Sequence, residues 1–391
     1  MKEVVVVAAK RTAIGSFLGS LKQTDAAQLC GLLAKAMLDE ARVDKSLIDE
    51  LILGQVLSAG CGQNVARQAL IKSDLGIDKT AFVVNMLCGS GLKAVELGFE
   101  SIRSGRADLI LCGGVENMSR APFLLENARL GYKMGHQSAI DSMIKDGLWC
   151  ALSDCHMGIT AENLAKKYGI SRQEQDEFAL NSQLKAQKAL ETKAFDAEIV
   201  PLKIQDKKRE FIFDEDEFVR KNVSLEDLAR LKPVFDKSGT VTAGNSSGIN
   251  DAAALLLLSS KERALELNLP ILAKLKAFAS VGVEPGIMGI GAAFAAKKVL
   301  QNSKYALGDM KLIEANEAFA AQSLAVMKEL KADAARVNVN GGAIALGHPI
   351  GASGARILVS LIHALRKRSE NLGLATLCVG GGQGIAAVVE I

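Results

Sequence analysis

Two stretches of this sequence contain the same order of structural signals, and this repetition is the main basis for predicting the fold. The first is NMLCGSGLKAVELGFESIRSGRADLILCGG over residues 85–114, and the second is GGAIALGHPIGASGARILVSLIHALRKRSENLGLATLCVGGG over residues 341–382. Each runs from a glycine-rich turn into a helical pattern and then into an apolar strand that ends in cysteine and glycines. The repetition predicts an internally doubled chain with Cys88, His348 and Cys378 at comparable ends of its units. Strand–turn–helix units also recur by convergence, which leaves the duplication open.

Around these stretches, apolar runs of strand length alternate with amphipathic helical periods, the pattern of an α/β protein. Strands are predicted over residues 4–8, 51–57, 82–87, 109–112, 252–258, 271–279, 311–314, 337–340 and 375–379. Helices are predicted over residues 26–41, 92–104, 161–168 and 354–368. We expect these helices to cover the faces of the sheet.

The middle of the chain, about residues 119–250, breaks this rhythm. It is richer in charge, holds the acidic run 214–217 and has few strand-like runs. We interpret it as an insertion that covers the core, and loops on a rigid scaffold commonly carry ligand contacts. The predicted organisation is an N-terminal half over residues 1–118 plus 250–270, an inserted loop domain over residues 119–249, and a C-terminal half over residues 271–391.

Composition excludes several classes of protein. The 391 residues carry 47 Lys and Arg against 44 Asp and Glu, so no excess of positive charge indicates a nucleic-acid or membrane partner. No apolar run approaches the roughly 18 residues of a membrane-spanning helix, and the start MKEVVVVAAKRT lacks the layout of a signal peptide. We expect a cytoplasmic protein that acts on small molecules, with its seven cysteines as free thiols.

Cys88 is a candidate nucleophile. It follows an apolar strand and precedes Gly89-Ser90-Gly91, where a helix is predicted to begin. A helix N-terminus lowers the pKa of a thiol toward neutrality, and the glycines let another group approach the sulfur. A small buried hydrophobic residue at a strand end is the alternative interpretation of this local pattern.

His348 and Cys378 are the other two reactive candidates. His348 stands alone among the glycines of residues 341–354, which clear space around an imidazole and favour a general base over a structural histidine. Cys378 ends an apolar strand and precedes glycines whose N–H groups could face an oxyanion. Two thiols and one imidazole predict covalent catalysis on an acyl group, with carbon–carbon bond chemistry beside a thioester.

Three other kinds of site find little support. The glycines at residues 380–384 lead into a strand and lack the pattern of a phosphate-binding loop. The first strand is followed by Lys10-Arg11-Thr12, without the glycines of a dinucleotide site. Cys150, Cys155 and His156 have the wrong spacing for zinc and no second pair of ligands, so no metal is expected.

At these residues the sequence resembles the thiolases, over essentially the whole chain. NMLCGSGLKA resembles the nucleophile segment of that family, GGAIALGHPIGASGAR its histidine segment and CVGGGQG its second-cysteine segment. TAGNSSGINDAAA at residues 242–254 and NEAFA at residues 316–320 lie between them in the expected order. The resemblance implies a thiolase-like duplicated, layered αβαβα fold of two five-stranded halves with an inserted loop domain, assembled as a homotetramer from tight dimers.

The resemblance also implies roles for five residues. Cys88 would be acylated, His348 would activate it, and Cys378 would be the acid/base acting on the α-carbon of the substrate. Asn316 would hold a water in a first oxyanion hole together with His348. The backbone N–H groups of Cys88 and Gly380 would form a second oxyanion hole.

Within the family, HMGITAEN at residues 156–163 resembles the biosynthetic, short-chain branch. Met157, and likewise Met288, could close the acyl pocket beyond a two-carbon unit. The implied reaction is a reversible Claisen condensation of two acetyl-CoA to acetoacetyl-CoA and CoA, with coenzyme A as substrate or product and no cofactor. Coenzyme A contacts carry over onto Leu148, His156, Met157, Arg220, Ala243, Ser247 and Phe319.

Several alternatives stay open at this point. A thiolase for longer 3-ketoacyl-CoA substrates is the nearest, and a catalytically silent CoA-ester-binding protein is another. A β-ketoacyl synthase fits less well, because those relatives pair their cysteine with two histidines, whereas this sequence has Asn316 and Cys378. A reversible disulfide between Cys88 and Cys378 is a further hypothesis.

Overall fold

The fold is built on one long mixed sheet whose strand order is β14-β15-β16-β13-β1-β12-β5-β3-β4, with β2 paired to β12. The computed structural model describes residues 1–206 and 209–391. The N-terminal elements are β1 (Val4–Arg11), β2 (Gly15–Ser16), α1 (Ala26–Ala41), β3 (Glu50–Gly54), α2 (Val65–Lys72), β4 (Thr80–Val84), α3 (Ser90–Arg103), β5 (Leu109–Asn117) and β12 (Asn250–Ser260). The C-terminal elements are α7 (Lys261–Glu266), β13 (Ala273–Gly282), α8 (Gly291–Ser303), β14 (Leu312–Ala315), α9 (Ala320–Leu330), α10 (Ala343–Leu346), α11 (Ile350–Lys367), β15 (Leu372–Val379) and β16 (Gln383–Glu390).

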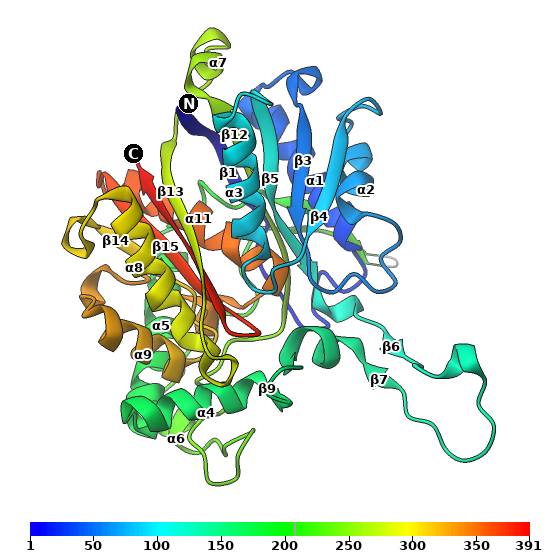
Figure 1. Cartoon of the computed structure of the whole chain (residues 1–391), viewed down its shortest axis with the longest axis vertical. Coiled ribbons are helices and arrows are strands. Elements are labelled where there is room, and N and C mark those ends of the chain that lie inside the picture. Colours follow the sequence, from blue (N-terminus) through cyan, green and yellow to red (C-terminus); the bar gives the residue numbers. More distant parts are fainter. Residues whose placement is uncertain (207–208) are drawn as a thin grey trace.

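Helices lie in three layers around this sheet (Figure 1). One outer layer is α1 and α2, which pack with one face of the N-terminal strands, and the other is α8, which packs with β13, β15 and β16. Between them, α3 and α11 pack against each other and against strands of both halves. Every residue of α11 from Ile350 to Ile362 is buried, as a helix covered on all sides requires. This arrangement is the layered α/β architecture predicted from the sequence.

Two glycines let the central helices cross closely. A Cβ on Gly91 of α3 would lie 2.8 Å from the backbone nitrogen of Ala355. A Cβ on Gly354 of α11 would lie 2.5 Å from the backbone nitrogen of Leu92. Since both distances are shorter than real Cβ contacts, only glycine fits at this crossing. The crossing also brings the segments just before the two helices together, and these carry Cys88 and His348.

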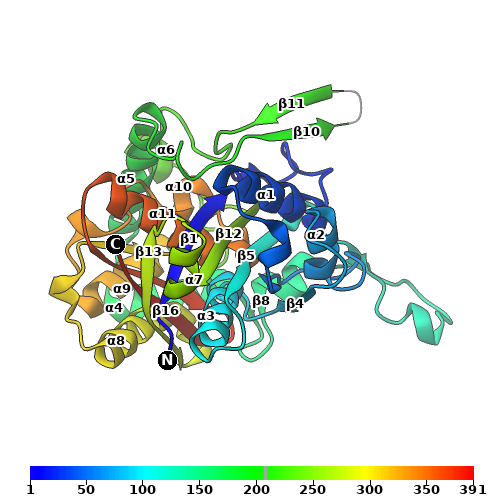
Figure 2. The same cartoon turned by 90° about the horizontal axis from the view of Figure 1, so that it is seen from above.

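An insertion is predicted for the segment between β5 and β12. Its elements are β6 (Phe123–Leu124), β7 (Ile140–Asp141), β8 (Trp149–Cys150), β9 (Cys155–His156), α4 (Met157–Tyr168), α5 (Arg172–Glu191), β10 (Leu202–Asp206), β11 (Arg209–Phe213) and α6 (Leu225–Ala229). Seen from above, the β10–β11 hairpin and the β6–β7 arm extend beyond the layered body (Figure 2). A buried cluster joins the insertion to the core, because the Arg11 guanidinium donates to Glu198 at 2.6 Å and to Asp216 at 2.7 and 2.9 Å.

The strand predicted over residues 337–340 is wrong. Only an isolated bridge between Ile313 and Val337 forms there, so the C-terminal half adds four strands to the described part of the sheet, where five were expected. The cause is Asn338, whose backbone turns into the left-handed region (φ 45°). Its side-chain amide instead accepts from the Ala315 N–H at 2.9 Å and donates to the Ala315 carbonyl at 2.8 Å. Hydrogen bonds from the Asn338 side chain thus replace the backbone hydrogen bonds that a strand at this position would form with β14.

Candidate active site

Cys88 lies in a tight turn between β4 and α3. Leu87 adopts a left-handed conformation (φ 46°), and the Ser90 hydroxyl donates to the Leu87 carbonyl at 2.6 Å while accepting from the Met86 N–H at 2.8 Å. The half-buried Cys88 side chain packs against an apolar cluster that includes Met118 and Ile350. The turn therefore places Cys88 against the first residue of α11, two positions after His348 in the sequence.

The expected lowering of the Cys88 pKa is wrong. Burial raises the pKa of the Cys88 thiol to about 11, although the backbone N–H groups of Gly380 and of Cys88 itself counteract it. Desolvation thus outweighs the helix N-terminus and the nearby N–H donors. The resting nucleophile is a thiol, so a base has to take its proton before it can attack an acyl group.

His348 is held so that its Nε2 atom can serve as that base. Its backbone N–H donates to Asn250 Oδ1 at 3.0 Å, and its Nδ1 lies 2.6 Å from the Ser353 Oγ. Because the Ser353 hydroxyl gives its only hydrogen to the Pro349 carbonyl at 2.9 Å, it accepts from Nδ1–H. This network assigns the lone pair to Nε2, which is buried and has no hydrogen-bond partner among the described residues.

The environment keeps the imidazole neutral. Burial, together with the nearby Arg356 guanidinium, lowers the pKa of His348 to about 3. At neutral pH the ring is therefore unprotonated and able to accept a proton.

Replacing Ser353 by alanine should slow turnover about tenfold without weakening the binding of a CoA ester. The Nδ1–H would lose its acceptor, and a hydrogen bond worth about 1–1.5 kcal/mol corresponds to roughly tenfold in rate. Ser360→Ala is the matched control, since Ser360 is buried on the same helix and donates one hydrogen bond, to Glu198 at 2.9 Å. Steady-state kcat and KM of both variants test this; an equal fall in kcat for Ser360→Ala would reduce Ser353 to a structural role.

Cys378 lies at the end of β15, opposite Cys88. It is fully buried in an apolar cluster with Met157, Met288 and Phe319. Burial raises the pKa of the Cys378 thiol, and the negative charge of a Cys88 thiolate would raise it further. The Gly380 N–H, two residues on, faces the Cys88 sulfur as described above. The structure thus brings both thiols and Gly380 to one place.

Asn316 follows β14 and is buried. Arg356 Nη2 donates to its Oδ1 at 3.4 Å, and Arg356 itself lies 3.6 Å from Glu314 on β14. Because the Arg356 guanidinium donates to the carbonyl oxygen of the Asn316 amide, the Nδ2 donor of that amide points away from Arg356. In the part of the chain that the structure describes, this Nδ2 has no hydrogen-bond partner. It is an unused donor suited to a bound water.

A mostly apolar cavity of about 480 Å³ reaches His348 from the surface. That volume lies in the usual range for small-molecule sites. Eight predicted residues line it, namely Leu148, His156, Met157, Arg220, Ala243, Ser247, Phe319 and His348. The other predicted residues, Cys88, Cys378, Asn316, Gly380 and Met288, are outside this lining; Cys88, Cys378 and Met288 pack against clusters that share residues with it.

One wall of the cavity is aromatic. The His156 ring stacks on Phe235 with centroids 4.5 Å apart, and Phe235 meets Phe319 edge to face at 6.2 Å. His156 Nδ1 also accepts from the Gly158 N–H at 3.1 Å, which caps α4. Burial lowers the pKa of His156, so this wall is uncharged at neutral pH. At the mouth, the exposed Arg220 lies over Phe218, 5.5 Å from the ring centroid, where its charge can meet a phosphate.

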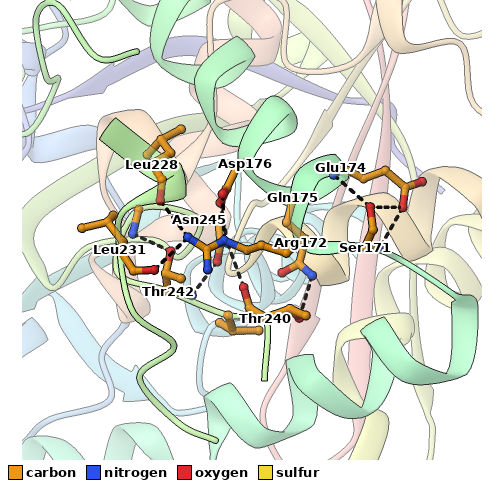
Figure 3. A network of polar contacts seen from close by, with 12 residues as sticks. Ser171, Arg172, Glu174, Gln175, Asp176, Leu228, Leu231, Thr240, Thr242 and Asn245 are labelled. Carbon is orange, nitrogen blue, oxygen red and sulfur yellow. Dashed lines mark hydrogen bonds and ion pairs between the residues drawn. The ribbon is translucent and has the colours of Figure 1, made fainter. Parts of the chain in front are cut away.

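The loop that carries Ala243 and Ser247 is fixed by a buried polar network (Figure 3). Arg172 Nε donates to Asp176 at 2.7 Å, and the other Asp176 oxygen accepts from Asn245 Nδ2 at 2.9 Å. Asn245 Oδ1 in turn accepts from the Thr242 N–H at 2.8 Å. The loop is therefore rigid before any ligand arrives, which limits the ordering cost of binding.

Sequence analysis missed three residues that position the site. Asn250 and Ser353 hold His348, although both lie inside quoted motifs, and Glu116 anchors the first turn of α11. The Glu116 carboxylate accepts from the N–H groups of Val56, Leu57 and Gly351 at 3.1, 3.1 and 2.9 Å. Burial raises its pKa to about 7 against the opposing pull of these donors. Only the folded chain shows what these side chains contact.

Among residues 1–206 and 209–391, no group of three or more His, Cys, Asp or Glu side chains is placed to hold a metal ion. Within the same residues, no helix combines the length and apolarity that crossing a bilayer requires.

The sequence matches the thiolase N-terminal domain over residues 4–262 and the thiolase C-terminal domain over residues 269–391. The chain belongs to the thiolase family. It is 56% identical to the acetyl-CoA acetyltransferase of Escherichia coli (strain K12) over 391 residues, which cover 100% of this chain and 99% of that one. It is 55% identical to an acetyl-CoA acetyltransferase of Pseudomonas aeruginosa, with 99% and 98% of the two chains covered.

A solved structure confirms the predicted fold class. The crystal structure of the Bacillus anthracis acetyl-CoA acetyltransferase superposes with a TM-score of 0.98 and 42% sequence identity, over 100% of this chain and 99% of that one. The predicted division into residues 1–118 plus 250–270, 119–249 and 271–391 stays a prediction.

Proposed function

We propose that this chain is an acetyl-CoA C-acetyltransferase that catalyses the reversible condensation of two acetyl-CoA to acetoacetyl-CoA and CoA. One observation carries the proposal. The half-buried Cys88 and the buried Cys378 lie close to each other, in clusters that share residues with an apolar cavity lined by the neutral imidazole of His348. The names of its full-length relatives support the same activity.

In the first half-reaction, His348 Nε2 takes the proton of the Cys88 thiol, and the sulfur attacks the thioester carbonyl of acetyl-CoA. The C–S bond to CoA breaks, His348 returns the proton to the leaving thiolate, and acetyl-Cys88 remains. Two backbone N–H groups, those of Cys88 and Gly380, would stabilise the oxyanion formed on the acetyl group. Their effect on the pKa of the Cys88 thiol supports this role.

In the second half-reaction, the Cys378 thiolate takes a proton from the α-carbon of a second acetyl-CoA. The resulting carbanion attacks the carbonyl of acetyl-Cys88, which forms the carbon–carbon bond and breaks the bond to the Cys88 sulfur. That sulfur leaves as a thiolate and takes up the proton carried by Cys378, so that both cysteines return to their starting states. The enolate oxygen would be held by His348 and by a water on the free Asn316 Nδ2. The reverse sequence cleaves acetoacetyl-CoA with CoA.

The substrate is proposed from the closed end of the pocket. The Met157 sulfur lies 3.6 Å from the position that a Cβ on Gly380 would occupy, and the Met157 side chain is only 7% exposed. Met288 fills the same apolar cluster. Little room remains beyond a two-carbon acyl group, which favours acetyl-CoA and acetoacetyl-CoA over longer substrates. The exposed lining residues, with Arg220 at the mouth, would take the rest of coenzyme A.

The test is CoA-dependent cleavage of 3-ketoacyl-CoA substrates of increasing chain length. We expect a sharp preference for acetoacetyl-CoA, and the variant Met157→Val should raise kcat/KM for the six-carbon substrate roughly tenfold. Met310→Val is the control, because Met310 is fully buried in a separate cluster away from the cavity. Equal turnover of long substrates by the unmodified enzyme would contradict the proposal and move the chain to the fatty-acid-degrading branch.

The proposed assembly is a homotetramer. The β6–β7 arm, which projects from the body in both views, carries the exposed apolar side chains Phe123, Leu125, Leu130 and Met134 (Figures 1 and 2). Exposed apolar groups of this kind mark protein interfaces. A monomeric mass by light scattering would contradict the tetramer. The cytoplasmic location and the lack of nucleic-acid or membrane partners stay predictions.

A further inference from the structure

A second pair of cysteines lies in a hairpin beside the cavity. Strand β8 pairs antiparallel with β9, in the register Trp149 to His156 and Cys150 to Cys155. Directly opposed residues have side chains on the same face and Cα atoms about 4.5–5.5 Å apart. A disulfide needs Cα atoms roughly 4.4–6.8 Å apart. The backbone therefore already holds Cys150 and Cys155 at bonding range, while both are free thiols in this structure.

The two thiols differ in access and in acidity. Burial raises the pKa of the Cys150 thiol, but N–H groups of Ser153, Leu152 and Gly381 and the Ser153 hydroxyl outweigh it, and the net pKa lies below its ordinary value. The pKa of Cys155 is raised by burial and by the charge of Cys150. Cys155 is the more exposed of the two side chains. Cys155 is thus the thiol that a reagent in solution can reach, and Cys150 supplies a stabilised thiolate that can attack the sulfur of a modified Cys155.

We propose that Cys150 and Cys155 are a reversible redox site that forms an intramolecular disulfide on exchange with a low-molecular-weight disulfide such as glutathione disulfide. Cys155 loses its proton and attacks the disulfide, which leaves one glutathione on Cys155 and releases the other as thiol. The Cys150 thiolate then attacks the Cys155 sulfur, forms the protein disulfide and expels the second glutathione, which takes up a proton. The protein loses two hydrogens, and one glutathione disulfide becomes two glutathiones.

The hairpin links this chemistry to the cavity. Leu148 directly precedes it, His156 is its last residue and Met157 follows as the first residue of α4; all three line the cavity. Gly381, whose N–H serves the Cys150 sulfur, is adjacent to Gly380 at the proposed oxyanion hole. Bonding Cys150 to Cys155 removes the thiolate that these donors stabilise. This expectation rests on the proposed function: oxidation of the pair should raise the KM for acetoacetyl-CoA roughly three- to tenfold. An increase of that size corresponds to the weakening of one hydrogen bond that fixes the wall of the cavity.

The oxidation state of Cys150 and Cys155 can be measured in a single tryptic peptide. Trypsin cuts after Lys145 and Lys166, so residues 146–166 contain both cysteines, whereas Cys88 and Cys378 lie in other peptides. The reduced full-length protein is equilibrated with glutathione and glutathione disulfide at neutral pH, and free thiols are then blocked. We expect peptide 146–166 to lose two hydrogens and to resist blocking. A peptide that stays reduced, or that carries a glutathione on each cysteine, would overturn the proposal.

Two variants sharpen the test. Cys150→Ser lacks the resolving thiol, and its peptide should therefore keep one glutathione on Cys155. Cys61→Ser is the matched control, because Cys61 is also half-buried but lies outside the hairpin, and its peptide 146–166 should oxidise as in the unmodified protein. Oxidation of the peptide is measured without any assay of acetyl transfer. Failure of the proposed function would leave this result intact, and a reduced peptide in an active enzyme would overturn the redox site alone.

Discussion

Replacing Cys88 by alanine should leave a folded protein that binds CoA esters but transfers no acetyl group. Alanine keeps the backbone of the turn between β4 and α3, including the Ser90 hydrogen bonds to Met86 and Leu87, and removes only the sulfur. The Cys88 sulfur is the thiol that faces the Gly380 N–H. Loss of the covalent nucleophile should lower activity by roughly 10⁴-fold or more.

Two measurements check this prediction. Incubation with acetyl-CoA followed by intact-mass analysis should show one acetyl group on the unmodified protein and none on Cys88→Ala. Calorimetric titration with CoA should give similar affinities for both. Cys61→Ala is the control, since Cys61 is half-buried like Cys88 but away from the cavity, and it should be acetylated normally. An acetyl adduct on Cys88→Ala would place the nucleophile elsewhere.

Much of the fold could be predicted because its signals are local. The helix predicted over residues 26–41 has these bounds in the structure, where Asp25 caps it by accepting from the Gln28 N–H at 2.7 Å. Local patterns failed where a tertiary contact decides the backbone. Helix α11 begins at Ile350, ahead of the predicted residue 354, because Gly351 and Gly354 are there for close packing and not for a turn.

For the candidate active site as well, local sequence patterns identified some features, and others depend on tertiary contacts. Cys88, His348 and Cys378 were found because each stands in a distinctive glycine-rich segment. The state of Cys88 could not be found in this manner, since its pKa depends on burial by residues distant in sequence. The same holds for the orientation of the Asn316 amide, which is set by the guanidinium of Arg356, 40 residues away in the sequence. Sequence patterns thus identified the reacting groups, and only the fold shows how their protons are placed.

Replacing Cys378 by alanine should separate the two half-reactions. Cys88 and His348 keep every contact that acylation uses, so the variant should still form acetyl-Cys88 and exchange the acetyl group with CoA. Condensation and cleavage need proton transfer at the α-carbon, and both should fall by about 10²–10⁴-fold. Acetyl exchange compared with acetoacetyl-CoA turnover measures the split. Equal losses in both assays would mean that Cys378 supports the Cys88 nucleophile instead.

The protonation of Cys378 gives this prediction a pH signature. Because burial raises the pKa of the thiol, the resting group is protonated at neutral pH and only a small thiolate fraction exists. Condensation needs the Cys378 thiolate beside acetyl-Cys88, and cleavage needs the Cys378 thiol beside a Cys88 thiolate, so both directions pass through a site that has lost one proton. The kcat/KM values of condensation and of cleavage by the unmodified enzyme should therefore rise together as pH increases from 6 to 9. Cys378→Ala should lose that rise, because no other described group is placed to take the α-proton.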